Sequence, residues 1–481
     1  MVTRAGAPSL LGPEYRAASL ALMSAVAMAS YNNLSVTAAL PAIGDDLGRV
    51  ALLPWVVTVE LVAAAVAVLA VGPYIDGAGA RRAFRLTVVA FVVTSAMCAA
   101  APTMELLIVA RVLQGLATGA FIGTAITCIG LVFDDAVRPW AYALMSSVWG
   151  IMGIGGPAVA AVLVSTLGWR SVFAANLPVS LVAAAVGWSR LPAAARAAAE
   201  RTDRRGLLIL SAFTVALLVA TSYVEWFSIV MVLAGVALAA LYVRHARSCR
   251  SPVVRLSHVA AGRWRYIHLV GVLAVSGGTG ASVFLPLYLK AARGHSVAFA
   301  AFAVVWPTLG WSTSAWVSGK LQQHLRAQTV TVIGSWFMAV GSVGVTVAAG
   351  IEAPVVVLLA AFVCAGAGIG TITTSSLSLL QGRADLQEMG RVSSAHHFIR
   401  SLGFAYGAAV AGLVMFWMVE RRTGDAELVR GLLSEADAVV DATVADALAS
   451  AYTWSLAAMA VLSVLTVPAA LALAQGRDHE P

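Results

Sequence analysis

The chain of 481 residues is 60% hydrophobic, only 11% of its residues are charged, and its mean hydropathy is +0.87. Soluble globular proteins carry about 25% charged residues, so these totals exclude a soluble fold and predict a protein embedded in a lipid bilayer. A formal net charge of +8 would suggest a nucleic-acid partner in a soluble protein. Here the basic residues lie between apolar runs, which indicates membrane topology and no nucleic-acid binding.

Fourteen apolar runs approach the roughly 20 residues that a bilayer-crossing helix needs. They lie at 16–40, 52–72, 86–101, 105–130, 141–165, 171–189, 206–223, 226–243, 266–288, 297–318, 329–349, 353–378, 393–418 and 451–474. The first run could pass for a signal peptide, but thirteen further runs favour a retained first helix. The sequence therefore predicts an all-α integral membrane protein with 14 transmembrane helices.

The distribution of basic residues predicts the orientation. With the N-terminus inside, 22 of the 31 Lys and Arg residues fall in inner segments and seven in outer segments, while Arg111 and Arg400 lie inside apolar runs. This asymmetry follows the positive-inside rule, so both termini are expected in the cytoplasm.

Known signatures of enzymes and metal sites are missing from the sequence. It has no GxxxxGK[ST] phosphate loop, HExxH, GxSxG or Cys/His cluster with metal spacing. We therefore expect no enzyme, no metal site and no energy from ATP hydrolysed by this chain.

The second run ends in GPYIDGAGARR, with Gly72, Asp76, Gly79, Arg81 and Arg82. The glycines permit a sharp turn and close helix approach, and Asp76 can cap a neighbouring helix or pair with Arg81 or Arg82. The spacing resembles the signature loop between helices 2 and 3 of the major facilitator superfamily. The resemblance implies a cytoplasmic latch that joins the two halves during alternating access.

The fourth run contains ARVLQGLATG, in which Arg111 and Gln114 share one helix face. Arginine inside a span costs at least about 2.5 kcal/mol, so a buried acid or a water-filled cavity must offset it. The pattern resembles the superfamily's fourth-helix motif, whose arginine is linked to proton transfer. An arginine with a purely structural role is the alternative.

Three further segments resemble one branch of the same superfamily, the fourteen-span drug:proton antiporters. WGIMGIGGPAVAA, with Gly155, Gly156 and Pro157, resembles the antiporter motif of the fifth helix; GWRSVFAANLPVS resembles the start of the sixth, and GRVSSAHHFIRSLGFAYG the penultimate helix. This branch includes self-resistance exporters of antibiotic-producing actinomycetes, such as those for lincomycin. The resemblance implies two six-helix bundles, at 1–190 and 266–481, with two additional helices within 191–265.

The superfamily's first helix normally places an acid before an Ala-Leu-Pro, but YNNLSVTAALPAI has Asn32 at that position. At 1.5 Å per residue, Asn32 and Glu60 each lie ~12 Å, and Arg111 ~9 Å, below the outer ends of their runs. We hypothesise that Glu60 replaces the missing acid, paired with or near Arg111. Burial penalises the charged carboxylate and the arginine stabilises it, so that Glu60 can exchange a proton. A structural ion pair, or a glutamate that snorkels outward, is the alternative.

Two regions near the C-terminus leave alternatives open. His396 and Arg400 are four residues apart and share a helix face, which suggests either a proton relay or an interfacial histidine beside a cavity arginine. The outer segment 419–449 has the pattern of a short amphipathic helix, which is either a plain connector or a docking site for an outer-face partner.

Together these features predict a multi-pass protein of the bacterial inner (plasma) membrane that exports a hydrophobic or amphipathic small molecule, such as an antibiotic, in exchange for protons. It needs no cofactor, because the proton gradient supplies the energy. The alternatives are an exporter of a lipid or cell-envelope precursor that works with an outer-face partner, and a proton-coupled uptake symporter.

Overall fold

The computed structural model describes residues 12–49, 52–188, 203–222, 226–424 and 442–475, together with Leu10 and Leu191, and these residues form helices and connecting turns without a β-strand. Segment 425–441, the centre of the predicted outer-face docking site, lies outside the described residues. The residues from 12 to 261 form the helices α1 (Arg16–Leu47), α2 (Leu53–Ala78), α3 (Ala80–Ala99), α4 (Met104–Val132), α5 (Arg138–Leu167), α6 (Arg170–Ala174), α7 (Asn176–Gly187), α8 (Arg204–Ser222), α9 (Trp226–Ser248) and α10 (Ser257–Ala260).

The later helices are α11 (Gly262–Val283), α12 (Leu285–Leu287), the π-helix η2 (Tyr288–Ala292), α13 (Val297–Ala303), α14 (Val305–Leu321), α15 (Ala327–Gly350), α16 (Val355–Gln381), α17 (Met389–Thr423), α19 (Ala442–Val464) and α20 (Thr466–Gln475). Each of the fourteen predicted apolar runs overlaps one, two or three consecutive helices of this series.

Twelve helical segments among the described residues are long and apolar enough to cross a membrane. They are 53–78, 80–99, 104–132, 138–167, 170–187, 230–248, 262–292, 297–321, 327–350, 355–381, 389–423 and 442–475. The predicted first and seventh runs lie in α1 and α8, which are not among these twelve. In α1, the adjacent Asn32 and Asn33 interrupt an otherwise apolar stretch.

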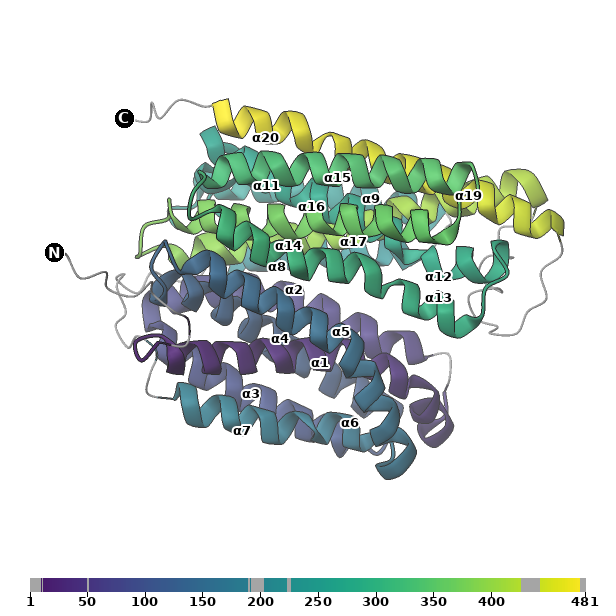
Figure 1. Ribbon diagram of the computed structural model, residues 1–481. Coiled ribbons are helices and arrows are strands. Elements are labelled where there is room, and N and C mark those ends of the chain that lie inside the picture. Colours follow the sequence, from purple (N-terminus) through teal and green to yellow (C-terminus); the bar gives the residue numbers. More distant parts are fainter. Residues whose placement is uncertain are drawn as a thin grey trace. The chain divides into compact units, whose positions relative to one another are not determined.

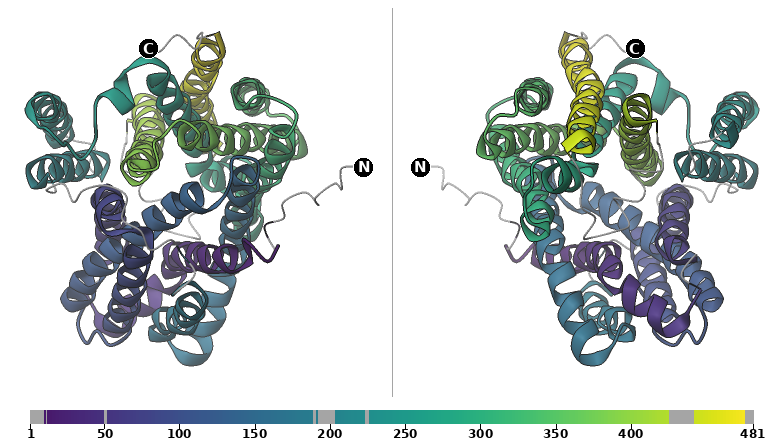
Figure 2. Two further views of the ribbon diagram at one scale, coloured as in Figure 1. Left: turned by 90° about the vertical axis from the view of Figure 1, so that its left-hand side faces the viewer. Right: turned by 90° about the vertical axis from the view of Figure 1, so that its right-hand side faces the viewer.

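The chain divides into two compact units. The first contains the described residues within 12–219, 229–261 and 377–398, and the second those within 220–228, 262–376 and 399–475. In the first unit, α1 packs beside α5 and α7, and α4 beside α2 and α3 (Figure 1). Figure 2 views the same helices from their ends.

Small residues on α4 hold α2 and α4 unusually close. A Cβ atom added to Gly115 would lie 2.4 Å from the backbone oxygen of Glu60, and one added to Gly119 would lie 2.0 Å from that of Ala64. Gly123, four residues further on, faces the side chain of Val71. This four-residue repeat of glycine is the small-residue pattern that lets membrane helices approach backbone to backbone.

Aromatic and aliphatic side chains fill the space between the helices of the first unit. One buried cluster includes Leu22, Phe84, Phe91, Phe121 and Tyr142, which come from α1, α3, α4 and α5. A second buried cluster, which includes Val36, Val56, Leu107 and Phe173, lies among α1, α2, α4 and α6.

The second unit has its own core. The rings of Tyr288 and Tyr452 stack with their centroids 4.7 Å apart, and the Tyr452 hydroxyl donates to the backbone oxygen of Ala281 at 2.8 Å. Gly407 of α17 lies against the backbone of Ser276 in α11, since a Cβ there would be 2.2 Å from the Ser276 oxygen. Glycine again permits two helices to meet at their backbones.

Candidate functional site

A group of polar side chains lies deep among α1, α2 and α4. Asn32, Glu60, Arg111 and Gln114 are each at most 1% exposed. Burying a charge in an apolar interior is unfavourable unless it is paired and hydrogen-bonded, so these contacts decide whether the group is stable.

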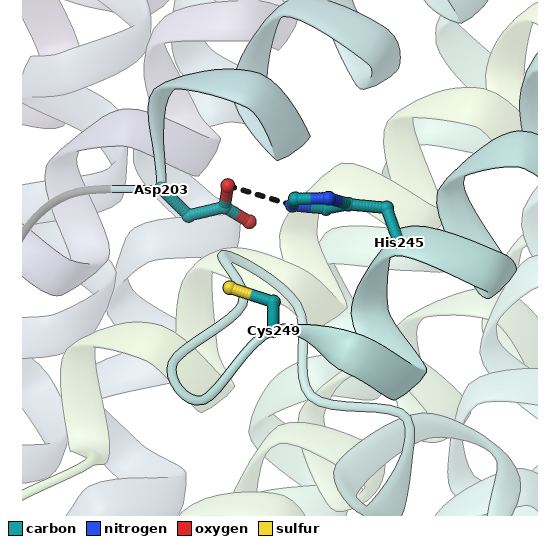
Figure 3. A group of neighbouring side chains, drawn as sticks. All are labelled: Asp203, His245 and Cys249. Atoms are coloured by element: carbon teal, nitrogen blue, oxygen red, sulfur yellow. Dashed lines mark hydrogen bonds and ion pairs between the residues drawn. The ribbon is translucent and has the colours of Figure 1, made fainter.

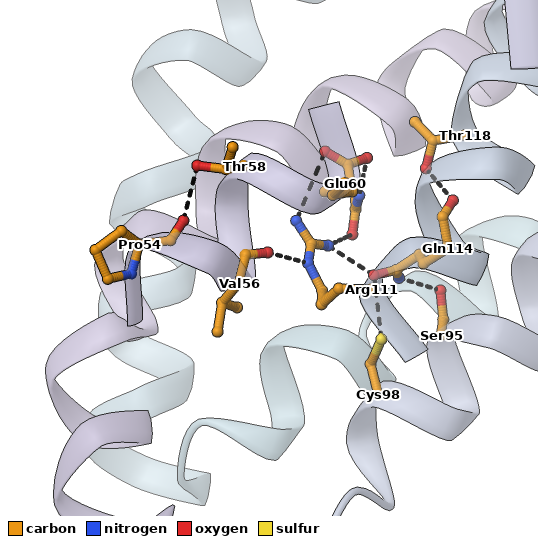
Figure 4. Close-up of polar contacts among 10 residues, drawn as sticks. Pro54, Val56, Thr58, Glu60, Ser95, Cys98, Arg111, Gln114 and Thr118 are labelled. Carbon is orange, nitrogen blue, oxygen red and sulfur yellow. Dashed lines mark hydrogen bonds and ion pairs between the residues drawn. The ribbon is translucent and has the colours of Figure 1, made fainter. Parts of the chain in front are cut away.

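Arg111 is the centre of the group (Figure 4). Its Nε donates to the Val56 backbone oxygen at 2.8 Å, and its Nη1 donates to Gln114 Oε1 at 2.7 Å and to Asn32 Oδ1 at 3.4 Å. Its Nη2 lies 3.6 Å from Glu60 Oε2, and its guanidinium carbon is 5.8 Å from the centroid of the Phe173 ring. Arg111 therefore keeps several neutral acceptors in addition to one carboxylate.

Glu60 has amide neighbours besides this arginine. Asn32 Nδ2 donates to Glu60 Oε1 at 3.3 Å. In the amide orientation that satisfies both of its ends, the Asn33 nitrogen donates to both carboxylate oxygens of Glu60 at 3.1 Å. Asn33 was not among the residues predicted from the sequence, although its position beside Asn32 in an apolar run is a visible signal.

The structure thus brings together Asn32, Glu60, Arg111 and Gln114 of the predicted site. The carboxylate faces the guanidinium at a distance longer than that of a close ion pair, and amide groups lie around both. Gln114 extends the network to α3, because its Nε2 donates to Ser95 Oγ at 2.9 Å. Such a group can hold Glu60 in a charged or a neutral form, since Arg111 has other acceptors in either case.

Asp76, near the end of α2, caps the N-terminus of α17. Its two carboxylate oxygens accept hydrogen bonds from the backbone N–H of Gly390 at 2.7 Å and of Arg391 at 2.9 Å. Gly72 makes this approach possible, because a Cβ there would lie 2.5 Å from the Gly390 oxygen. Of the two predicted roles for Asp76, the structure shows the cap, and residues 377–398 fold within the first unit.

The rest of the predicted latch turns the chain from α2 into α3. Gly79 has φ +86°, a conformation that favours glycine over other residues. Arg81 Nε donates to the backbone oxygen of Leu191 at 2.7 Å, and Arg82 is exposed. Arg81 therefore binds a backbone oxygen of Leu191 in place of the pairing with Asp76 that the sequence offered as an alternative.

A charged cluster that the sequence did not predict adjoins this cap. Glu388, just before α17, pairs with Arg255, and its Oε2 lies 3.3 Å from His258 Nε2. Arg391 donates to Ser251 Oγ at 3.0 Å. Burial lowers the pKa of His258 below its usual value, although Glu388 opposes the shift.

The predicted antiporter motif lies in the middle of α5. Pro157 is inside this helix, and Gly156 faces Leu34 and Tyr31 of α1 across an ordinary van der Waals distance. Gly155 has open space around its Cα, since a Cβ there would meet nothing within 4 Å. Close contact with another helix therefore does not require glycine at positions 155 and 156, whereas it does at positions 115 and 119.

His396 and Arg400 both lie in α17, but they belong to different compact units. His396 is 1% exposed and so is buried within the first unit, whereas Arg400 is half-buried and lies in the part of α17 that folds with the second.

Comparison with known proteins identifies relatives of the chain. It is 29% identical over 435 residues to an uncharacterised transporter from Mycobacterium tuberculosis, with 88% of this chain and 63% of that protein covered. It is 26% identical over 438 residues to a probable multidrug-efflux transporter of the same organism, with 87% of this chain and 91% of that protein covered. It is also 24% identical over 402 residues to the multidrug transporter protein MdtP of Bacillus subtilis, with 82% of this chain and 74% of that protein covered. The chain thus spans less than two thirds of the length of the first of these relatives.

Solved structures share the fold at low sequence identity. The human organic anion transporter MFSD10 (TETRAN) aligns with a TM-score of 0.63 at 14% identity, covering 95% of this chain and 99% of that one. The proton:xylose symporter XylE aligns with a TM-score of 0.59 at 14% identity, covering 93% and 94%. The family model of the Major Facilitator Superfamily matches residues 20–408. The chain therefore belongs to the Major Facilitator Superfamily.

Proposed function

We propose that this protein is a multi-pass membrane transporter, not an enzyme, and that it exports a hydrophobic or amphipathic small molecule, such as an antibiotic, in exchange for protons. The observation that carries the proposal is the buried Glu60, which faces Arg111 at 3.6 Å and is surrounded by amides. The names of two relatives, a probable multidrug-efflux transporter and a multidrug transporter, support a drug-like cargo.

The contacts of Arg111 explain how Glu60 can bind and release a proton without breaking the site. When Glu60 is charged, the guanidinium and the amides stabilise the carboxylate. When Glu60 is neutral, Arg111 keeps its bonds to Val56, Gln114 and Asn32, so its charge stays satisfied. The proton then moves with the conformation of the protein, and no cofactor is needed because the proton gradient supplies the energy.

Alternating access requires contacts that break and form again. The cap of α17 by Asp76 is our candidate for such a contact, because it includes two hydrogen bonds and a close backbone approach of Gly72 and Gly390. Pro157 and the uncrowded Gly155 give α5 a place to bend. In this scheme Arg400 lines the cavity for the cargo, and His396 on the same helix takes part in proton transfer.

We further propose fourteen spans, both termini in the cytoplasm, the bacterial inner membrane as location and the fourteen-span branch as subgroup. The 32 residues of α1 extend over roughly 48 Å and the 19 residues of α8 over roughly 28 Å, against a hydrocarbon core of about 30 Å. Adding both helices to the twelve candidate spans supports this count. The division into two six-helix bundles at 1–190 and 266–481, with two additional helices within 191–265, is part of the same proposal.

The test is transport by the purified protein in lipid vesicles with an imposed proton gradient and a pH-sensitive dye inside. A panel of cationic and neutral amphipathic drugs serves as cargo. We expect drug-dependent proton movement for the native protein and none for Glu60→Gln. Glu105→Gln is the matched control, because Glu105 is about half exposed and pairs with Arg49 at the surface.

Unchanged drug-driven proton flux in Glu60→Gln would refute the role of this carboxylate. Native protein that moves no proton with any drug on the panel would contradict drug:proton exchange. In that case, movement of a lipid-linked cargo in the same vesicles would support the alternative exporter of envelope precursors.

A further inference from the structure

A second group of chemically reactive side chains lies away from Glu60, where α8 begins and α9 ends. Asp203 directly precedes α8, and His245 and Cys249 lie four residues apart at the end of α9. One oxygen, one nitrogen and the sulfur of these three residues all lie within 4.8 Å of one another. Figure 3 shows the imidazole and the thiol approaching the Asp203 carboxylate from two sides.

The spacing of His245 and Cys249 places both on one face of a helix. The N–H of Cys249 still donates to the His245 backbone oxygen at 2.9 Å, so the last turn of the helix includes the cysteine. Two ligands four residues apart on a helix are a common way to bind a metal, because both side chains point to the same side. The sequence shows this pair as HARSC, but its partner Asp203 lies 42 residues before His245.

The Asp203 carboxylate is fixed in direction by the backbone around it. Its Oδ1 accepts from the N–H of Gly206 at 2.8 Å and lies 2.8 Å from His245 Nε2, while its Oδ2 accepts from Val253 N–H at 3.3 Å. The side chain is only 4% exposed. Hydrogen bonds of this kind are what orients carboxylate ligands around a metal ion.

We propose that Asp203, His245 and Cys249 form a binding site for a zinc ion, with a fourth position open to water. Carboxylate, imidazole and thiolate are the three ligand types that zinc takes, at about 2.0 to 2.3 Å. In a tetrahedral site these atoms are about 3.3 to 3.8 Å apart, so each has to shift by roughly 1 Å or less from its present place. The two negative charges of carboxylate and thiolate balance a divalent cation.

The competing interpretation is a helix cap with a His–Asp pair. Asp203 does cap α8 through Gly206, and His245 does pair with it. In this interpretation Cys249 has no role, whereas a metal site uses its sulfur as a ligand. The site would join the start of α8, the end of α9 and the turn that contains Val253, and it does not depend on the proposed drug export.

Cobalt(II) is the probe, because bound to a thiolate in a tetrahedral site it absorbs in the near ultraviolet. The full chain, purified in detergent and stripped with a chelator, is titrated with Co²⁺ and then with Zn²⁺. We expect about one equivalent to bind, the thiolate band to vanish in Cys249→Ser, and zinc affinity to fall by more than the 10- to 100-fold typical of outer-shell changes. Cys364→Ser, which changes a half-buried cysteine in α16, is the matched control.

Thermal unfolding with and without zinc separates the two interpretations. A zinc site predicts that zinc raises the melting temperature of the native protein and of Cys364→Ser, but not of Cys249→Ser or His245→Ala. A simple cap predicts no thiolate band, no effect of zinc, and a Cys249→Ser variant as stable as the native chain. A band that persists in Cys249→Ser also overturns the proposal, because the metal would then bind elsewhere.

Discussion

Removing Arg111 is expected to destabilise the protein far more than removing Glu60. Arg111→Met leaves a carboxylate that is 1% exposed without its cation, and breaking a buried pair in this way costs about 3–5 kcal/mol. Glu60→Gln instead leaves Arg111 with its bonds to Val56 and Gln114.

The magnitude for Glu60→Gln follows from two opposing terms. At 3.6 Å and an effective dielectric constant of about 20, the lost attraction is about 5 kcal/mol. Against this, an amide does not have the several kcal/mol of desolvation cost that a buried carboxylate has. The two terms nearly cancel, so we expect a net change within about 1 kcal/mol and recovery of most of the lost stability in the double variant.

The assay is reversible unfolding of each variant in mixed detergent micelles, arranged as a double-mutant cycle. Arg49→Met is the control, because Arg49 and Glu105 are only 2.6 Å apart but are 69% and 49% exposed. Solvent screens an exposed pair, so removing Arg49 should change stability far less than removing Arg111, although the Arg49–Glu105 distance is the shorter one. A double variant no more stable than Arg111→Met would refute this reasoning.

Two further predictions concern packing and pH. Gly119→Val should greatly reduce the yield of folded protein, because its Cβ would lie 2.0 Å from the Ala64 oxygen. The Cβ of Gly155→Ala meets nothing within 4 Å, so this variant should behave as the native chain in size-exclusion chromatography. Burial lowers the pKa of His258 from 6.5, so the folded state binds its proton less readily than the unfolded state. Stability should therefore fall as the pH drops below 6.5, until the lower folded-state pKa is passed. His258→Gln should flatten that part of a melting-temperature profile, and an unchanged slope would contradict this origin.

The residues that meet at Glu60 show how far sequence reasoning reaches. Helices are straight rods with a known rise, so counting from the end of each apolar run predicts that Asn32, Glu60 and Arg111 lie at a similar depth. Such counting does not give the rotation of each helix about its axis, which decides which side chains face one another. For that reason Asn33 was missed, although in the structure its amide faces both oxygens of Glu60.

The sequence by itself determined the membrane class, the position of the apolar runs and the motifs that mark the superfamily, because these depend on composition, period and local spacing. The tertiary structure decided which helices are neighbours. Asp76 and Gly390 are 314 residues apart, and Asp203 and His245 are 42 apart, so no local pattern joins them. Helical periodicity tells which residues share a face, but only packing tells what that face meets.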